Sequence, residues 1–126
     1  MKPVSPAATY VSMIPPLTEA AREVGYALAV HGSMGRDLDL IAVPWTEEAV
    51  TAEALIMRLL SAAGFLHAHL PHRQEGSTPD QASGDIGAVK PHGRRAWSIH
   101  FENGLYLDVS VMPLVAGPDG GGGRSA

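Results

Sequence analysis

The chain has 126 residues, which is enough for one domain around a single hydrophobic core. Hydrophobic residues make up 45% of it and charged residues 17%, values typical of a globular protein and not of a disordered chain. Nine Lys and Arg against 13 Asp and Glu give a net charge of −4. The chain therefore lacks the broad basic surface of proteins that bind duplex DNA strongly without regard to sequence.

The sequence shows neither an apolar targeting or membrane segment nor a cysteine, and these two features limit the expected location of the protein and the ligands available to a metal. No apolar run approaches the roughly 18–20 residues of a membrane span, and prolines stand where a signal peptide would have its apolar segment. We therefore expect a cytoplasmic protein without a membrane partner. The chain has no cysteine, so disulfides and thiolate ligands are excluded and any metal must be held by carboxylate or imidazole groups.

Both ends of the chain are rich in residues that disfavour regular structure. Prolines in residues 1–16 predict a flexible N-terminal segment, and the glycines of residues 115–126 predict a disordered tail. One ordered domain is therefore expected over residues 17–114.

The first half of this domain is expected to hold a short helix and two strands. Thr18 is a suitable N-cap for the helix, and Gly25 is placed to end it. Two apolar, β-branched runs follow at residues 27–31 and 37–43. Because so few residues separate these runs, they are expected to be antiparallel neighbours.

The second half is expected to begin with a longer helix and a long loop. Thr46 is the expected N-cap of this helix, which carries an apolar stripe and ends at Gly64. Residues 65–70 form a candidate short strand. The polar residues that follow, rich in Gly, Pro and Ser, predict a mobile loop over 71–93.

A β-hairpin is expected at the end of the domain. Two apolar runs flank Asn103-Gly104, a dipeptide preferred in two-residue turns because both residues accept a positive φ. Such a turn would set Ile99 opposite Asp108, whereas a bulge or a longer loop would change the register, and the sequence leaves both open. The predicted fold class is α/β, of the α+β type: a small, mixed, mostly antiparallel sheet with two helices on one face.

Three aspartates are placed to share the uncovered face of this sheet. Asp37 and Asp39 are two residues apart in a strand and therefore point to the same side. Asp108 lies on the polar side of the last strand, whose other side is formed by alternating Leu and Val. An all-oxygen cluster of this kind suits Mg²⁺ or Mn²⁺. The alternative is a solvated strand edge without a metal.

Histidines offer a second candidate metal site. His67, His69 and His72 carry nitrogen atoms that can bind zinc, although a solvated strand end explains the same pattern. His31, next to Gly32, and His100, beside the predicted hairpin, are better placed to reach a phosphate.

A Gly-Ser pair, Gly32-Ser33, follows the first predicted strand and precedes Asp37. The backbone amides and the small hydroxyl of such a pair can approach a phosphate closely. In this order the motifs resemble the polymerase-β-like nucleotidyltransferase superfamily, including its small antibiotic and bacteriophage-type members. That pattern is a strand, Gly-Ser or Gly-Gly, an Asp-x-Asp strand and a third Asp on a later strand. Here its residues are Gly32, Ser33, Asp37, Asp39 and Asp108.

The resemblance covers about residues 26–112 and implies a metal-dependent transfer of a nucleoside monophosphate from a nucleoside triphosphate, such as ATP, to an unknown hydroxyl acceptor. It implies that the three aspartates hold Mg²⁺ or Mn²⁺ and act in catalysis, and that Gly32 and Ser33 contact the phosphates. Basic side chains could neutralise the charge of the triphosphate. The candidates are Arg36, Lys90, Arg94 and Arg95.

The connection from Gly-Ser to the first aspartate is shorter than is usual in the superfamily. It consists of Met34, Gly35 and Arg36, which predicts that a phosphate-binding helix start is absent. Two alternative functions therefore stay open: a catalytically inactive binding module, and an antitoxin-like protein that modifies a partner protein. The sequence also leaves open the acceptor, the base preference and whether two copies form a homodimer.

Overall fold

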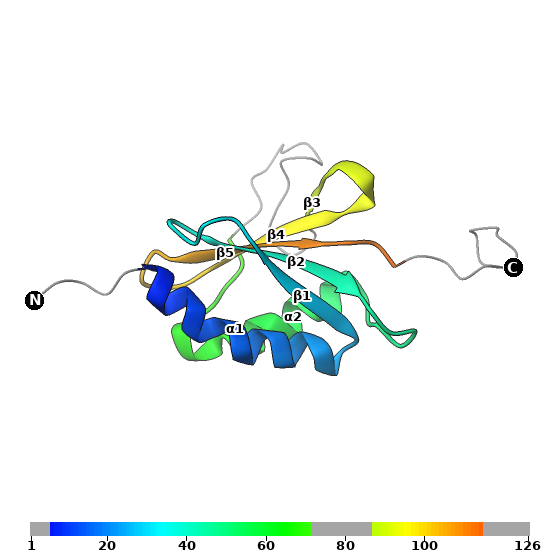
Figure 1. The fold of residues 1–126 in the computed structure, drawn as a ribbon, viewed down its shortest axis with the longest axis horizontal. Coiled ribbons are helices and arrows are strands. Elements are labelled where there is room, and N and C mark those ends of the chain that lie inside the picture. The colour runs from blue at the N-terminus through cyan, green and yellow to red at the C-terminus, as the bar shows by residue number, and fades with distance from the viewer. Residues whose placement is uncertain (1–5, 72–86, 115–126) are drawn as a thin grey trace, which may run out of the picture.

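Two helices cover one face of a five-stranded sheet (Figure 1). The computed structural model describes residues 6–71 and 87–114. The helices and strands are α1 (Pro6–Glu23), β1 (Tyr26–His31), β2 (Leu38–Pro44), α2 (Ala52–Ala62), β3 (Ala88–Val89), β4 (Arg95–His100) and β5 (Tyr106–Val111), with short 3₁₀ turns at Gly64–Leu66 and Pro91–Gly93.

The sheet has the strand order β1-β2-β5-β4-β3 and is mixed. The pairs β1–β2, β4–β5 and β3–β4 are antiparallel, whereas β2 and β5 are parallel although they are far apart in the sequence. The predicted fold class is therefore confirmed, including the antiparallel pairing of the first two strands.

The core lies between the sheet and the two helices. Alternate residues of β2, β4 and β5 point toward the helices and are buried, while the residues between them are partly exposed on the open face. The largest fully buried side chains are those of Trp97, Tyr10, Tyr26, Met13, Leu17, Leu38, Leu55, Ile56, Leu59, Ile99, Leu107 and Val109.

No helix within the described residues is long and apolar enough to span a membrane.

The prediction of a flexible segment over residues 1–16 is wrong from Pro6 onward. Helix α1 begins at Pro6 and continues through Pro15 and Pro16, so Thr18 lies inside it and is not its N-cap. Pro6 occupies the first turn, where a missing N–H costs nothing. The two internal prolines are exposed, so water can hydrate the carbonyls that they leave unpaired. Burial of the apolar stripe on the other side of α1 outweighs the proline penalty.

The second helix begins later than predicted. Its N-cap is Thr51, whose Oγ1 accepts a hydrogen bond from the Ala54 amide at 3.2 Å. Thr46, the expected cap, lies instead in a turn held to Gly25: the Trp45 and Thr46 amides both donate to the Gly25 carbonyl. This tertiary contact competes with helix formation over the residues before Thr51.

The hairpin between β4 and β5 has a three-residue loop. Phe101 and Leu105 close it, the Gly104 amide donates to the Phe101 carbonyl, and Gly104 has a φ of +86°. Ile99 consequently pairs with Leu107 and both are buried. Trp97 is buried as well.

The region after α2 differs in part from the prediction. Instead of a strand over residues 65–70 there is a 3₁₀ turn, followed by a single bridge between His69 and His100. Within the predicted loop 71–93, strand β3 pairs with β4 and a 3₁₀ turn follows it. Residues 72–86 of that loop and the predicted tail 115–126 lie outside the described residues.

Candidate functional site

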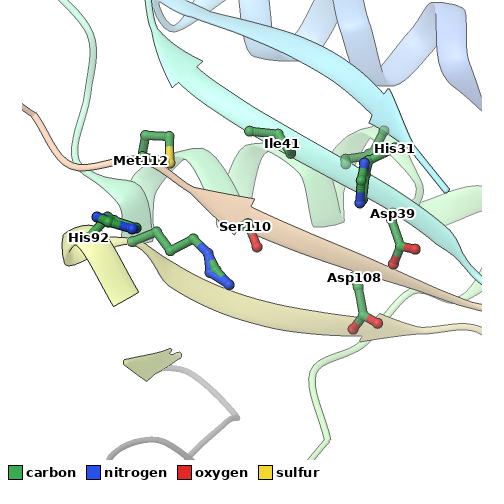
Figure 2. Close-up of a pocket in the computed structure, with 9 residues that line it drawn as sticks. His31, Asp39, Ile41, His92, Asp108, Ser110 and Met112 are labelled. Carbon is green, nitrogen blue, oxygen red and sulfur yellow. The ribbon is translucent and has the colours of Figure 1, made fainter. Parts of the chain in front are cut away.

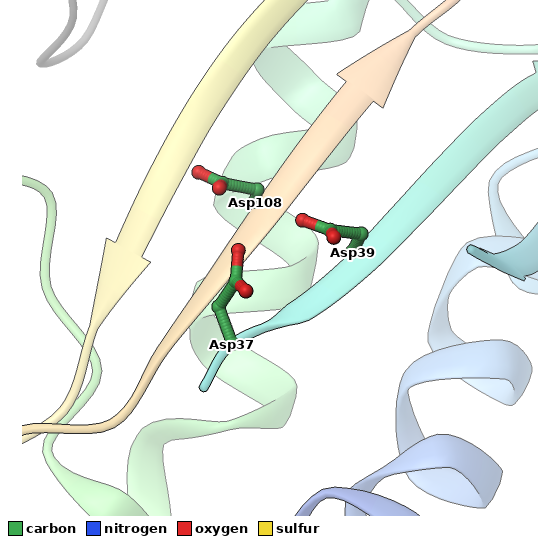
Figure 3. Close-up of side chains that lie close together, drawn as sticks. All are labelled: Asp37, Asp39 and Asp108. Atoms are coloured by element: carbon green, nitrogen blue, oxygen red, sulfur yellow. The ribbon is translucent and has the colours of Figure 1, made fainter. Parts of the chain in front are cut away.

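The structure brings Asp37, Asp39 and Asp108 together on the open face of the sheet (Figure 3). The parallel pairing of β2 and β5 sets Asp39 directly opposite Asp108, and Asp37 immediately precedes β2. One carboxylate oxygen from each of the three residues lies within 4.8 Å of the others, and all three side chains are partly exposed. The three carboxylates of the predicted cluster could therefore hold one cation between them.

Mutual repulsion and partial burial make the cluster unfavourable in its fully ionised form. Burial, together with the nearby carboxylates of Asp37 and Asp108, raises the pKa of Asp39 from its ordinary 3.8 to about 6, although His31 lowers it. Burial is also the main cause that raises the pKa of Asp108, followed by its hydrogen-bonded neighbour Asp37. A cation or a proton between these carboxylates would relieve the repulsion.

Neighbouring side chains on the open face orient the cluster. Ser98, which pairs with Asp108 across the β4–β5 hairpin, donates its hydroxyl to Oδ1 of Asp108 at 2.9 Å. His31 pairs with Asp39 across β1–β2 and, when protonated, favours the ionised carboxylate. His100 acts in the same direction on Asp108. Both histidines thus lie beside the carboxylates.

The Gly32-Ser33 segment lies next to the cluster, but it forms a turn and not a helix start. Gly32 has a φ of +84°, and a Cβ at this position would come within 2.7 Å of Oδ2 of Asp39. Glycine is therefore required both by the backbone conformation and by the proximity of the carboxylate. The Ser33 hydroxyl accepts a hydrogen bond from the Gly35 amide at 3.2 Å. The absence of a helix between β1 and β2 confirms the expectation drawn from the short connection.

The predicted basic residues are not gathered in one place. Arg94 lines a cavity together with Asp39 and Asp108, whereas Lys90 and Arg36 do not line it. Arg95 lies on the helix side of β4, where its guanidinium pairs with Glu53 at 2.9 Å and lies over the ring of Trp97. Strand alternation separates the two adjacent arginines, so only Arg94 is positioned with the carboxylates.

The cavity beside the carboxylates has a volume of about 380 Å³. His31, Asp39 and Asp108 lie at one end of it, and His92 and Met112 lie at the other (Figure 2). This volume is within the range of small-ligand sites. Sequence reasoning missed His92, Ser110, Met112 and Ile41, although period-two alternation places Ser110 on the same face as Asp108.

Tyr10 is a further residue that sequence reasoning missed. From helix α1, its hydroxyl donates to the Arg36 carbonyl at 2.8 Å and accepts from the Tyr106 amide at 3.2 Å. It therefore ties the segment before Asp37 to the start of the strand that carries Asp108. Burial raises the pKa of Tyr10, so the hydroxyl stays protonated and can both donate and accept. Its location in a proline-rich segment concealed this role.

The candidate zinc site is not assembled from the described residues. His67 lies within 3.4 Å of Glu102, and the His69 ring lies 6.1 Å from that of His100. The aspartates are the only group of three or more metal-ligating side chains that converge among the described residues. His72 lies outside the described residues.

Comparisons of the chain with protein-family models, with curated proteins and with solved structures found no match. The likeness to nucleotidyltransferases therefore depends on the residues themselves. Membership of that superfamily stays a prediction.

The raised pKa of Asp39 predicts a pH-dependent stability of the metal-free protein. Between its ordinary pKa of 3.8 and its folded value of about 6, the folded state binds more protons than the unfolded state. The contribution of Asp39 to stability is therefore fully present only below its ordinary pKa of 3.8, and it is lost as the pH rises through about 6. Urea unfolding in EDTA should show that this loss is smaller in Asp39→Asn. An identical pH profile for both proteins would contradict the prediction.

The Tyr10 contacts predict a coupling between helix α1 and the carboxylates. Tyr10→Phe removes both hydrogen bonds and should lower the free energy of unfolding by about 1–2 kcal/mol and weaken Mn²⁺ binding several-fold. Tyr26→Phe is the matched control, because its hydroxyl donates only to the Val50 carbonyl, away from the cluster. Calorimetric unfolding and Mn²⁺ titration should separate the two variants. Equal Mn²⁺ affinity in both would refute the coupling.

Proposed function

We propose that the protein is a metal-dependent nucleotidyltransferase that transfers a nucleoside monophosphate from a nucleoside triphosphate to a hydroxyl acceptor. One observation carries the proposal: Asp37 and Asp39 from one strand and Asp108 from its parallel neighbour converge beside Gly32, at the end of a cavity of about 380 Å³. The order and types of these residues are those of the superfamily that the sequence resembles.

The donor set of the cluster fits Mg²⁺ or Mn²⁺. All three residues offer carboxylate oxygens, the ligands that hard divalent cations prefer. The side chains are partly exposed, so water and substrate oxygens could complete the coordination sphere. When bound, the cation supplies positive charge for phosphate oxygens during phosphoryl transfer.

The protein's own residues would position the reaction. In the proposed transfer, the acceptor oxygen forms a bond to the α-phosphorus, the bond from this phosphorus to the bridging oxygen breaks, and pyrophosphate leaves. We assign the proton of the acceptor to Asp108, because a hydrogen bond from Ser98 holds its carboxylate in place. Gly32 leaves room for the Asp39 carboxylate close to the backbone.

A catalytically inactive nucleotide-binding module is the second candidate. It is favoured by the short turn between β1 and β2, which offers no helix start to the phosphates. In both cases we place the protein in the cytoplasm, where nucleoside triphosphates and Mg²⁺ are abundant. The acceptor would be a small molecule or, for an antitoxin-like enzyme, a partner protein.

Calorimetric titration with each nucleoside triphosphate in Mg²⁺ tests the proposal. The wild-type protein should bind at least one triphosphate only when the metal is present, and Asp37→Asn/Asp39→Asn should lose at least ten-fold in affinity. Glu47→Gln/Glu48→Gln is the matched control, because it removes the same number of charges from an exposed turn beyond β2. It should bind like the wild type.

The same proteins separate the two candidate functions. Release of pyrophosphate or transfer of a labelled nucleotide in cell extract, lost in the aspartate variant, would indicate an enzyme. Metal-dependent binding without turnover would indicate the inactive module. If both double variants bind as the wild type does, the carboxylates are not the nucleotide site and the proposal fails.

A further inference from the structure

The cavity beside the carboxylates changes its charge from one end to the other. Asp39 and Asp108 make one end acidic, whereas His92 lies at the other end (Figure 2). The guanidinium-bearing Arg94 also lines the cavity. Along the chain of β5 and the residue after it, four residue steps separate Asp108 from Met112, which corresponds to roughly 13 Å of extended backbone. A ligand that fills this cavity would therefore meet two chemically different groups.

Arg94 has a buried donor without a partner. Among the described residues, no hydrogen-bond acceptor contacts its Nη1, although water does not reach this atom. An unpaired guanidinium nitrogen is costly to bury. Because this atom is closed to water, an oxyanion in the cavity would accept its hydrogen bond only after the side chain turns toward the cavity, and that contact would remove the cost. The adjacent Arg95 differs, because its guanidinium already pairs with Glu53 on the other face of the sheet.

His92 reaches the same end of the cavity through an unusual backbone conformation. Its φ of 67° and ψ of 24° lie in the left-handed region, which is strained for a residue with a side chain. Gly93 follows with a φ of 77°. These two conformations make the sharp turn that places His92 beside the cavity, directly before Arg94 and strand β4. Backbone strain of this kind is found preferentially at ligand sites.

We infer that Arg94 and His92 form an oxyanion subsite that binds a phosphate group. The guanidinium and the imidazole can both donate hydrogen bonds to phosphate oxygens. Between them and the carboxylates lie Ile41 and Ser110, which leave the middle of the cavity uncharged. The subsite thus favours an elongated substrate that carries a phosphate away from the carboxylate end of the cavity.

Two sources could supply this phosphate: the nucleoside triphosphate itself or a phosphorylated acceptor. This choice rests on the proposed nucleotidyl transfer. The binding of an oxyanion by Arg94 and His92 does not rest on that transfer, because it requires neither metal nor turnover. The oxyanion subsite and the nucleotidyltransferase function can therefore be disproved separately.

The subsite is tested by calorimetric titration of the full chain with pyrophosphate in EDTA. The wild type should bind it, and Asp37→Asn/Asp39→Asn should bind it more tightly because two repelling charges are removed. In that background, Arg94→Gln should weaken binding at least ten-fold and Arg94→Lys less, whereas Arg95→Gln should change it by less than two-fold. Equal losses in Arg94→Gln and Arg95→Gln, or no binding in any protein, would overturn the subsite.

Amide chemical shifts of the unmodified protein provide a test that does not depend on variants. Pyrophosphate should shift the signals of residues 92–94 and 110–112 first. Shifts confined to other parts of the chain would overturn the assignment even if binding is observed.

Competition then identifies the source of the phosphate. Displacement of pyrophosphate by a non-hydrolysable ATP analogue with Mg²⁺ would support the subsite as the site of the nucleotide's own phosphates. Simultaneous binding of both would support it as the site of a phosphorylated acceptor. If pyrophosphate binds at the subsite but the analogue does not bind at all, the subsite is supported and the nucleotidyltransferase function is contradicted.

Discussion

The parallel pairing of β2 with β5 is the constraint on which the site depends. It joins two strands that are far apart in the sequence and sets Asp39 opposite Asp108. On the other face, the same register buries Leu38 against the core next to Leu107. A slip by one residue would expose these leucines and bury the aspartates. The hydrophobic core therefore fixes the register, and the register holds the carboxylates together.

Holding these carboxylates together costs stability in the metal-free protein. Partial burial and mutual repulsion raise the pKa of Asp39 and of Asp108, so their ionised forms are disfavoured in the folded state. Tyr10 helps to keep the carboxylates close together, because its hydroxyl hydrogen-bonds to the backbone just before Asp37 and at the start of β5. Binding of a cation would recover the cost, which is the arrangement expected of a preorganised metal site. The fold thus stabilises a group of charges that would not assemble unaided.

Much of this arrangement could be predicted from the sequence because it follows from local periodicity. Strand alternation puts Asp37 and Asp39 on one face and places Asp108 on the polar side of its strand. The Gly-Ser turn and the antiparallel pairing of the strands around it were predicted on the same grounds. Apolar runs and turn residues were sufficient to predict the fold class.

What the sequence concealed depends on tertiary contacts. The prolines of α1 predict flexibility, and only burial of residues such as Tyr10 against the sheet makes the segment helical. The start of α2 was misplaced because a turn held to Gly25 displaces the helix to Thr51. Arg94 and Arg95 were predicted to act together because they are adjacent in the sequence. If the start of β4 at Arg95 had been predicted, strand alternation would have placed the two side chains on opposite faces of the sheet.

Paramagnetic broadening by Mn²⁺ tests the central claim, that the three aspartates form one cation site, most directly. In amide spectra recorded with substoichiometric Mn²⁺, the first signals to disappear should be those of residues 37–39 and 107–109, while those of α2 persist. These two segments meet only through the β2–β5 pairing, so their joint loss would report on the assembled cluster. Broadening that begins at the exposed acids of residues 47–48, or that spreads evenly over the chain, would contradict the account.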